Sequence, residues 1–80
     1  MYLGVKELKP IDNYKLILTF GNNEVKIFDM IPYLDKMIFQ ELKDKNLFKS
    51  VKVSVDSIKW PNEADIDPKT LYEDSISYSN

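Results

Sequence analysis

The feature that most constrains the fold is a pair of alternating apolar segments joined by a short polar turn. Residues 14–20 alternate between two sides with the period of a β-strand. One side is predicted to carry Tyr14, Leu16, Leu18 and Phe20. Gly21-Asn22-Asn23 tolerates the backbone angles of a tight reversal. We therefore expect residues 24–29 to return as an antiparallel partner, with Val25 and Ile27 on one face.

A shorter strand precedes this hairpin. Val5 to Leu8 have strand character, and Pro10 is predicted to end the strand because proline donates no hydrogen bond to a neighbouring strand. Asp12-Asn13 supplies a turn. The first thirty residues therefore predict an antiparallel three-stranded meander.

The periodicity changes after Met30. A turn or a short helical piece is predicted around Pro32, and the apolar residues within 38–42 recur at helical spacing. Residues 46–49 are typical of a one-turn helix, in which Leu47 and Phe48 are predicted to plug a sheet face. An anchor pair for a partner protein is the alternative for these two side chains.

The second half contains a further alternating segment at residues 51–55, and Ile58 and Trp60 continue it after Asp56-Ser57. Two interpretations stay open, a second hairpin with Asp56-Ser57 at its turn or one long bent strand. Asp67 is predicted to cap a helix over residues 68–74, because its carboxylate can accept free N–H groups and Pro68 suits the first helical position.

This order of elements predicts an α+β fold, with a small antiparallel sheet (the three-stranded meander plus later strands) and short helices packed on it. The length of 80 residues allows one domain, which we expect to span residues 1–74. Residues 75–80 are polar and are predicted to form a frayed C-terminal tail.

Composition excludes several kinds of chemistry. The sequence has no cysteine, histidine or arginine, which removes disulfides, thiol nucleophiles, Cys/His zinc sites, imidazole catalysis and guanidinium clamps. The net charge is −2, so we expect no nucleic-acid partner. No charged-then-apolar leader and no apolar run near the ~18 residues of a membrane span occur. We therefore expect a cytoplasmic protein without membrane contact.

Charge is nevertheless distributed unevenly. Residues 1–60 carry ten lysines and eight acids, whereas residues 61–80 carry one lysine and five acids. Solvated faces with an acidic end explain this division, and contact between the acidic end and a basic partner is the alternative. Lysines that alternate with apolar residues on strands are expected to face water.

The acidic residues do not predict a metal or cofactor site. Glu63, Asp65, Asp67 and Asp74 approach the spacing of a calcium loop, but Pro68 occupies the position where that loop needs glycine. We expect Asp65 to hold the preceding loop through backbone hydrogen bonds. Asp29 is likewise predicted to accept backbone N–H groups in the turn that follows it, and no catalytic residue is assigned.

Trp60 is the most informative single residue. We expect it to be buried as an anchor between the sheet and the final helix, next to Leu71 or Tyr72 and the strand face that bears Leu16 and Leu18. Its alternative role is an exposed contact residue, because tryptophan is enriched at interfaces.

Together these motifs resemble a bacterial family known as domain of unknown function 2442, over residues 3–72. The matching positions are Tyr14-x-Leu16-x-Leu18-x-Phe20, Gly21, Glu24, Phe28-Asp29, Phe39-x-x-Leu42, Leu47-Phe48-x-x-Val51 and Ile58-x-Trp60-Pro61-Asn62-x-Ala64-Asp65-Ile66-Asp67-Pro68-x-x-Leu71-Tyr72. One departure is Glu63, where the family usually has glycine, so the turn must form without glycine or with Asn62 in the left-handed region.

The resemblance implies a small α+β fold with no assigned enzymatic activity. Some relatives precede a helix-turn-helix segment, and others are encoded beside a second small protein, as in toxin–antitoxin pairs. These 80 residues contain no helix-turn-helix, so a DNA-binding role does not carry over.

We therefore expect a binding or regulatory module that acts through a protein partner and is antitoxin-like, with a homo-oligomer through a sheet edge as a further option. The predicted contact residues are Trp60, Asn62, Asp65 and Tyr72. The alternatives are a carboxylate-based enzyme or a small-ligand or metal-binding protein using Asp29, Asp65 and Asp67, and a purely structural domain.

Overall fold

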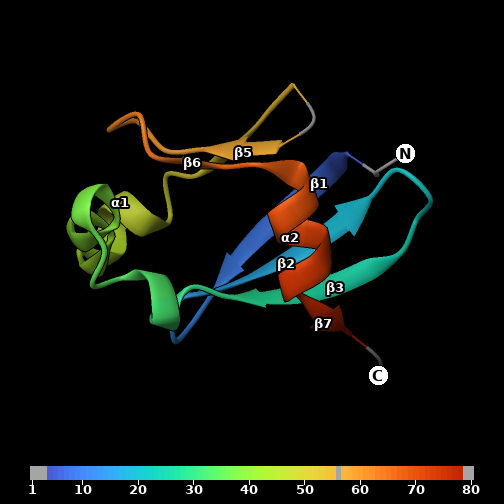
Figure 1. Cartoon of the computed structure of the whole chain (residues 1–80), viewed down its shortest axis with the longest axis horizontal. Coiled ribbons are helices and arrows are strands. Elements are labelled where there is room, and N and C mark those ends of the chain that lie inside the picture. Colours follow the sequence, from blue (N-terminus) through green and yellow to red (C-terminus); the bar gives the residue numbers. More distant parts are fainter. Residues whose placement is uncertain (1–3, 56, 79–80) are drawn as a thin grey trace.

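The computed structural model describes residues 4–55 and 57–78 (Figure 1). A four-stranded antiparallel sheet contains β1 (Val5–Ile11), β2 (Lys15–Phe20), β3 (Val25–Asp29) and β7 (Ile76–Ser77), in the order β1-β2-β3-β7. The predicted meander of the first three strands is confirmed. β7 was not predicted, because it lies in the segment that we expected to fray.

The prediction that Pro10 ends the first strand is wrong. β1 continues through Pro10 to Ile11, and Pro10 lies opposite Leu16 of β2. The physical reason is the position of β1 at the edge of the sheet. There is no second neighbouring strand in this sheet to which residue 10 would have to donate an N–H, so proline is tolerated.

The inner face of this sheet forms one side of the core. Leu16, Leu18, Phe20 and Phe28 are each 0% exposed, which confirms the alternation predicted for the hairpin. Lys26 also lies on this face and is only 9% exposed, although we expected strand lysines to face water. A buried ammonium group requires compensation, and its partners on the final helix are described below.

Tyr14 belongs to the turn between β1 and β2 and not to the inner face of β2. The φ angles of Asn13 and Tyr14 are 65° and 59°, so both adopt the left-handed conformation. The Tyr14 ring instead packs edge-on against Phe48 with 5.3 Å between ring centroids, and its hydroxyl donates a hydrogen bond to the Lys43 carbonyl. The next turn follows its prediction, since Asn23 has a φ of 69°.

Three short helices follow the meander, namely the 3-10 helices η1 (Ile31–Tyr33) and η2 (Met37–Lys43) and the α-helix α1 (Lys45–Phe48). The carboxylate of Asp44 caps α1 by accepting the Asn46 N–H at 2.9 Å. Phe48 is 2% exposed and Leu47 is half-buried against the core. The predicted plug is therefore confirmed, most fully for Phe48.

Residues after α1 form a second, three-stranded antiparallel sheet of β4 (Lys52–Ser54), β5 (Ser57–Lys59) and β6 (Asp65–Ile66). Ser54 lies opposite Ser57, so the hairpin interpretation is correct. Ser57 begins β5 and does not lie in the turn as predicted, and Asp56 lies outside the described residues. Val55, with a φ of 57°, takes a left-handed conformation that is unusual for a β-branched residue.

The final helix, α2 (Pro68–Asp74), begins as predicted. The Asp67 carboxylate accepts the Thr70 N–H at 2.7 Å, and Pro68 occupies the first turn. Figure 1 shows α2 lying across β2 and β3, with its end leading directly into β7. Ser75 is buried and Ile76 pairs with Ile27, so this part of the predicted frayed tail extends the sheet.

Candidate functional site

The indole of Trp60 is buried within a cluster of aromatic rings. Trp60 is 1% exposed, and its ring centroid lies 6.4 Å from that of Phe39 and 6.2 Å from that of Phe48. Its Nε1–H donates to the Phe48 carbonyl at 3.0 Å, which satisfies the only polar group of the side chain. The predicted burial of Trp60 is confirmed, whereas its predicted contact with Leu71 or Tyr72 stays a prediction, and the aromatic rings beside it come from η2 and α1. In this fold Trp60 is inaccessible to a partner.

Asn62 joins the loop after β5 to the short helices. Its Oδ1 accepts the Ala64 N–H at 3.1 Å, while its Nδ2 donates to Glu41 Oε1 at 2.6 Å. The same amide nitrogen lies 3.4 Å from the Ile38 carbonyl. Asn62 therefore holds the loop through a backbone hydrogen bond, which is the role predicted for Asp65, and it also attaches the loop to η2.

Asp65 is exposed on β6, opposite Lys59. Within residues 4–55 and 57–78 no hydrogen bond or ion pair of its carboxylate is found, so the prediction that Asp65 holds the preceding loop is wrong. Asn62 serves better there because its amide both donates and accepts. In the same described ranges no three carboxylates converge as metal ligands.

Tyr72 connects α2 to the inner face of the sheet. Its hydroxyl donates to Glu24 Oε1 at 2.7 Å, and its ring packs edge-on against Phe20 with 5.0 Å between centroids. The Lys26 ammonium lies 3.9 Å from the ring centroid and donates to the Tyr72 carbonyl at 2.7 Å. These two contacts compensate the burial of the ammonium group, and its positive charge interacts favourably with the dipole at the C-terminal end of α2.

The hydrogen bond between Tyr72 and Glu24 shifts the pKa values of the two side chains in opposite directions. The pKa of Glu24 is lowered, chiefly by hydrogen bonds from Asn22 and then from Tyr72. The pKa of Tyr72 is raised, chiefly because its hydroxyl donates to the Glu24 carboxylate. Both pKa shifts favour the observed state, in which an ionised Glu24 lies beside a protonated Tyr72. The pair therefore stabilises the contact between α2 and the sheet.

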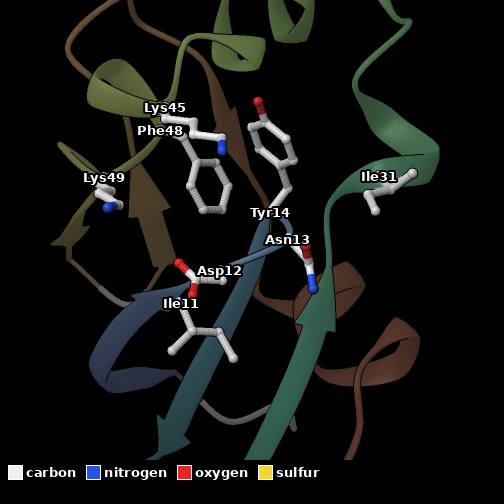
Figure 2. A pocket seen from close by; sticks show the side chains of 8 residues that line it. All are labelled: Ile11, Asp12, Asn13, Tyr14, Ile31, Lys45, Phe48 and Lys49. Carbon is white, nitrogen blue, oxygen red and sulfur yellow. The ribbon is translucent and has the colours of Figure 1, made fainter.

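A depression with a volume of about 570 Å³ lies between the β1–β2 turn and α1. Figure 2 shows Lys45 of α1 and Lys49, directly after it, on one side and Asp12 and Asn13 of the turn on the other, around the ring of Phe48. This combination of two ammonium groups and an aromatic floor can hold an acidic or anionic group. None of the four predicted contact residues (Trp60, Asn62, Asp65 and Tyr72) lies in it.

A smaller depression of about 370 Å³ contains Asp29, Tyr33, Lys36 and Asp74. Asp29 accepts the Ile31 N–H at 3.0 Å, which confirms its predicted turn role. The Tyr33 hydroxyl donates to Asp74 Oδ2 at 2.7 Å, and this bond, with burial, raises the pKa of Tyr33 to about 12. The tyrosine is thus held protonated as a tether between η1 and α2.

The outer face of the four-stranded sheet carries an apolar surface that sequence reasoning missed. We define the outer face by the five apolar side chains among those that alternate with the inner ones on β2, β3 and β7, a side that also carries Lys15, Thr19 and Asp29. The five are Ile17, Val25, Ile27, Ile76 and Tyr78. Ile76 is 68% exposed, Tyr78 is 41% exposed, and the three others are half-buried although neighbouring strands flank them. None of the five belongs to the described core cluster.

The two edges of this sheet differ in protection. The β1 edge contains Pro10, the lysines Lys6 and Lys9 and an irregular register between Val5 and Glu7, and β4 approaches it. Such features prevent a strand from pairing with another chain. The β7 edge has none of them across residues 75–78, which are two serines, an isoleucine and a tyrosine.

Comparison with protein families gave a match over most of the chain. The model of a family described as "Protein of unknown function (DUF2442)" matches residues 5–77. The chain belongs to the DUF2442 family. Comparisons with curated proteins and with solved structures gave no match.

The match extends through β7, so this strand is part of the DUF2442 region. The structure also explains the unusual Glu63. Glu63 itself adopts a left-handed φ of 74°, in place of Asn62 as one alternative predicted, and the Trp60 carbonyl accepts its N–H at 3.0 Å. The conformation of this DUF2442 loop is therefore the one that glycine takes without cost.

The four predicted contact residues of this DUF2442 chain have different surroundings. Trp60, Asn62 and Tyr72 hold elements together, and Asp65 alone of the four is exposed. The partner contacts proposed for Asn62, Asp65 and Tyr72 stay predictions. No helix in the described part of the chain is long and apolar enough to cross a membrane.

Proposed function

We propose that this protein is a small binding or regulatory module of the cytoplasm that acts through contact with a protein partner, in the manner of an antitoxin. The observation that carries the proposal is the outer face, an apolar surface on a sheet whose inner face already holds the core. Exposed contiguous apolar patches of a few hundred Å² are typical of interaction sites.

The size of the outer face supports contact with a protein. Strands β2, β3 and β7, spaced about 4.8 Å apart and about four residues long on average, project an area of roughly 200 Å². A stable interface buries about 800 Å² on each partner. The outer face is therefore the centre of a larger interface or one part of a weak one.

Charge supports a basic partner. Glu63, Asp65, Asp67, Glu73 and Asp74 are all exposed, and they follow one another through β6 and α2. Only Ser75 separates the last two from β7, so an acidic rim adjoins the apolar surface. Complementary charge of this kind accelerates association with a basic protein and selects against acidic ones.

The test is affinity purification of the tagged protein from its own host, with a matched pair of variants. Ile27→Lys places a charge in the middle of the outer face, whereas Met37→Lys changes an 87% exposed apolar residue of η2. We expect wild type and Met37→Lys to retain the same specific protein, and Ile27→Lys to lose it while keeping a cooperative thermal transition.

Two results would contradict the proposal. One is equal retention by Ile27→Lys and wild type, which would remove the outer face from the interface. The other is a hydrolytic activity of the purified protein that disappears on changing Asp29 or Asp65, which would favour the carboxylate-based alternative.

A further inference from the structure

We propose that strand β7 pairs with β7 of a second copy of this chain about a twofold axis at Ser77, which joins two four-stranded sheets into one of eight strands. This inference rests on the proposed function, because the same pairing joins the two outer faces into one surface.

The register of β7 determines which backbone groups face outwards. The Tyr78 N–H donates to the Val25 carbonyl at 3.0 Å, and Ser77 lies opposite Lys26. In an antiparallel ladder, hydrogen-bonded and non-hydrogen-bonded pairs alternate along the strands. Residue 78 uses its groups towards β3, so the N–H and carbonyl of Ser77 point towards the open edge.

With a twofold axis at Ser77, both the outward N–H and the outward carbonyl of this residue are hydrogen-bonded. The two copies of Ser77 become a hydrogen-bonded pair, and each donates its N–H to the carbonyl of the other. Such an interface is isologous, since the same patch serves both subunits. It requires no second binding surface and it closes on itself.

The side chains are self-complementary in the same register. Ile76 of one copy lies opposite Tyr78 of the other, as a close non-hydrogen-bonded pair on the outer face. The apolar rows then continue across the junction, from Ile27 and Ile76 of one copy to Tyr78 and Val25 of the other. Ser77 points to the inner face and is small enough to lie beside its counterpart.

Charge and edge protection favour a second copy as the occupant. Residues 75–78 contain no charged side chain, so two copies place no like charges opposite each other along this segment. A β7 edge without proline, lysine or bulge is open to strand addition. The joined outer faces project roughly 400 Å², about half of the area of about 800 Å² that each partner buries in a standard interface.

The cysteine-free sequence allows a test of register. Ile76→Cys and Tyr78→Cys are made separately, and the purified variants are oxidised mildly, alone and as an equimolar mixture. The expected Cα separation of a close cross-strand pair, about 4.5 Å, suits a disulfide. We expect disulfide-linked dimers to form at least about tenfold faster in the mixture than in either variant alone, at protein concentrations where wild type sediments as a dimer.

Ser77→Pro and Ser77→Thr provide the matched pair. Proline removes only the N–H that faces the open edge, whereas Ser77→Thr keeps it and favours a strand. Dimer in wild type and Ser77→Thr, with monomeric but folded Ser77→Pro, supports the pairing. Monomeric wild type at every concentration, or equal crosslinking in mixed and separate samples, overturns it. Retention of the Ile27-dependent host partner by a monomeric wild type would leave the proposed function standing, which separates the two failures.

Discussion

The loop and helix of residues 60–72 and the outer face of the sheet contrast in how the sequence marks them. The first region carries the most specific motif of the chain, and its central residue, Trp60, is 1% exposed. The second region consists of ordinary strand residues, and its Ile76 is 68% exposed. In this chain, distinctive sequence therefore indicates parts that organise the fold, while the surface available to a partner is unremarkable in sequence.

The contrast follows from the different demands on each region. A buried indole needs a hydrogen-bond acceptor and fitting rings, and an amide such as Asn62 needs partners on two sides, so few residues satisfy these positions. An apolar sheet face needs only β-branched or aromatic residues at alternate positions. Substitutions in the two regions should accordingly separate stability from binding.

The largest effect is expected for Trp60→Ala. Loss of burial and the resulting cavity should lower the free energy of unfolding by about 3–5 kcal/mol, measured by chemical denaturation. Met37→Ala, at an exposed apolar position, is the control and should change little. A Trp60→Ala variant as stable as the parent would break the comparison.

Asn62→Ala should cause the next largest loss of unfolding free energy. It removes the acceptor of the Ala64 N–H and the bonds to η2, and we expect a loss of about 1–2 kcal/mol. Asp65→Ala, on the exposed side of the same segment, should change the free energy by less than about 0.5 kcal/mol. Equal losses of stability for the two substitutions would indicate that Asp65 also holds the loop.

Glu63→Gly should stabilise the protein. Relief of the left-handed conformation is worth roughly 1–2 kcal/mol, and the greater freedom of glycine in the unfolded chain offsets about 0.5–1 kcal/mol of it. The exposed ion pair with Lys59, at 3.4 Å, contributes little. Glu63→Gln, which loses the charge and keeps the strain, is the control. A less stable glycine variant would mean that the ion pair outweighs the strain.

Ile76→Ser should leave stability within about 0.5 kcal/mol of wild type, because the side chain is mostly exposed. The same variant should weaken association of two copies. Thermal unfolding at low protein concentration measures the first effect, and sedimentation measures the second. A large loss of monomer stability would show that the outer face supports the fold as residues 60–72 do.

Tyr33→Phe should have its effect only below strongly alkaline pH. The pKa of Tyr33 in the folded protein, about 12, lies above its ordinary value of 10.0. The folded state therefore holds the proton more tightly, and this contribution is present below pH 10 and is lost as the pH rises towards 12. The stability difference between wild type and Tyr33→Phe should shrink over that interval. A constant difference would mean that the tether to Asp74 does not depend on the proton.

Local patterns predicted the parts of the fold that depend on neighbouring residues. The strand period over residues 14–20, the turn at Gly21-Asn22-Asn23 and the Asp67 cap are all decided within a few residues. Pairings between distant segments were missed. Nothing local indicates that Ile76 lies opposite Ile27, or that Lys26 points inward to a carbonyl 46 residues away.

The candidate site was less predictable for the same reason. Trp60 and Asn62 were predicted as partner contacts because they lie in the most specific motif of the chain. In the structure both side chains instead bond to the short helices. Ile17 and Ile27 gave no signal, because a half-buried position on the outer side of a strand has the same composition as a core position. Only the register of β7 shows that the surface continues to the edge of the sheet.

The pairing of β7 with β3 also bears on the order of events during folding. The hydrogen bond between Tyr72 and Glu24 joins positions 48 residues apart, and closing so long a loop costs chain entropy before any contact repays it. The hairpin of β2 and β3 closes over a short turn and can form early. We therefore expect β7 to dock last, so that the edge and its apolar rows exist only on a fully folded molecule. A partner that recognises them would ignore incomplete chains during synthesis.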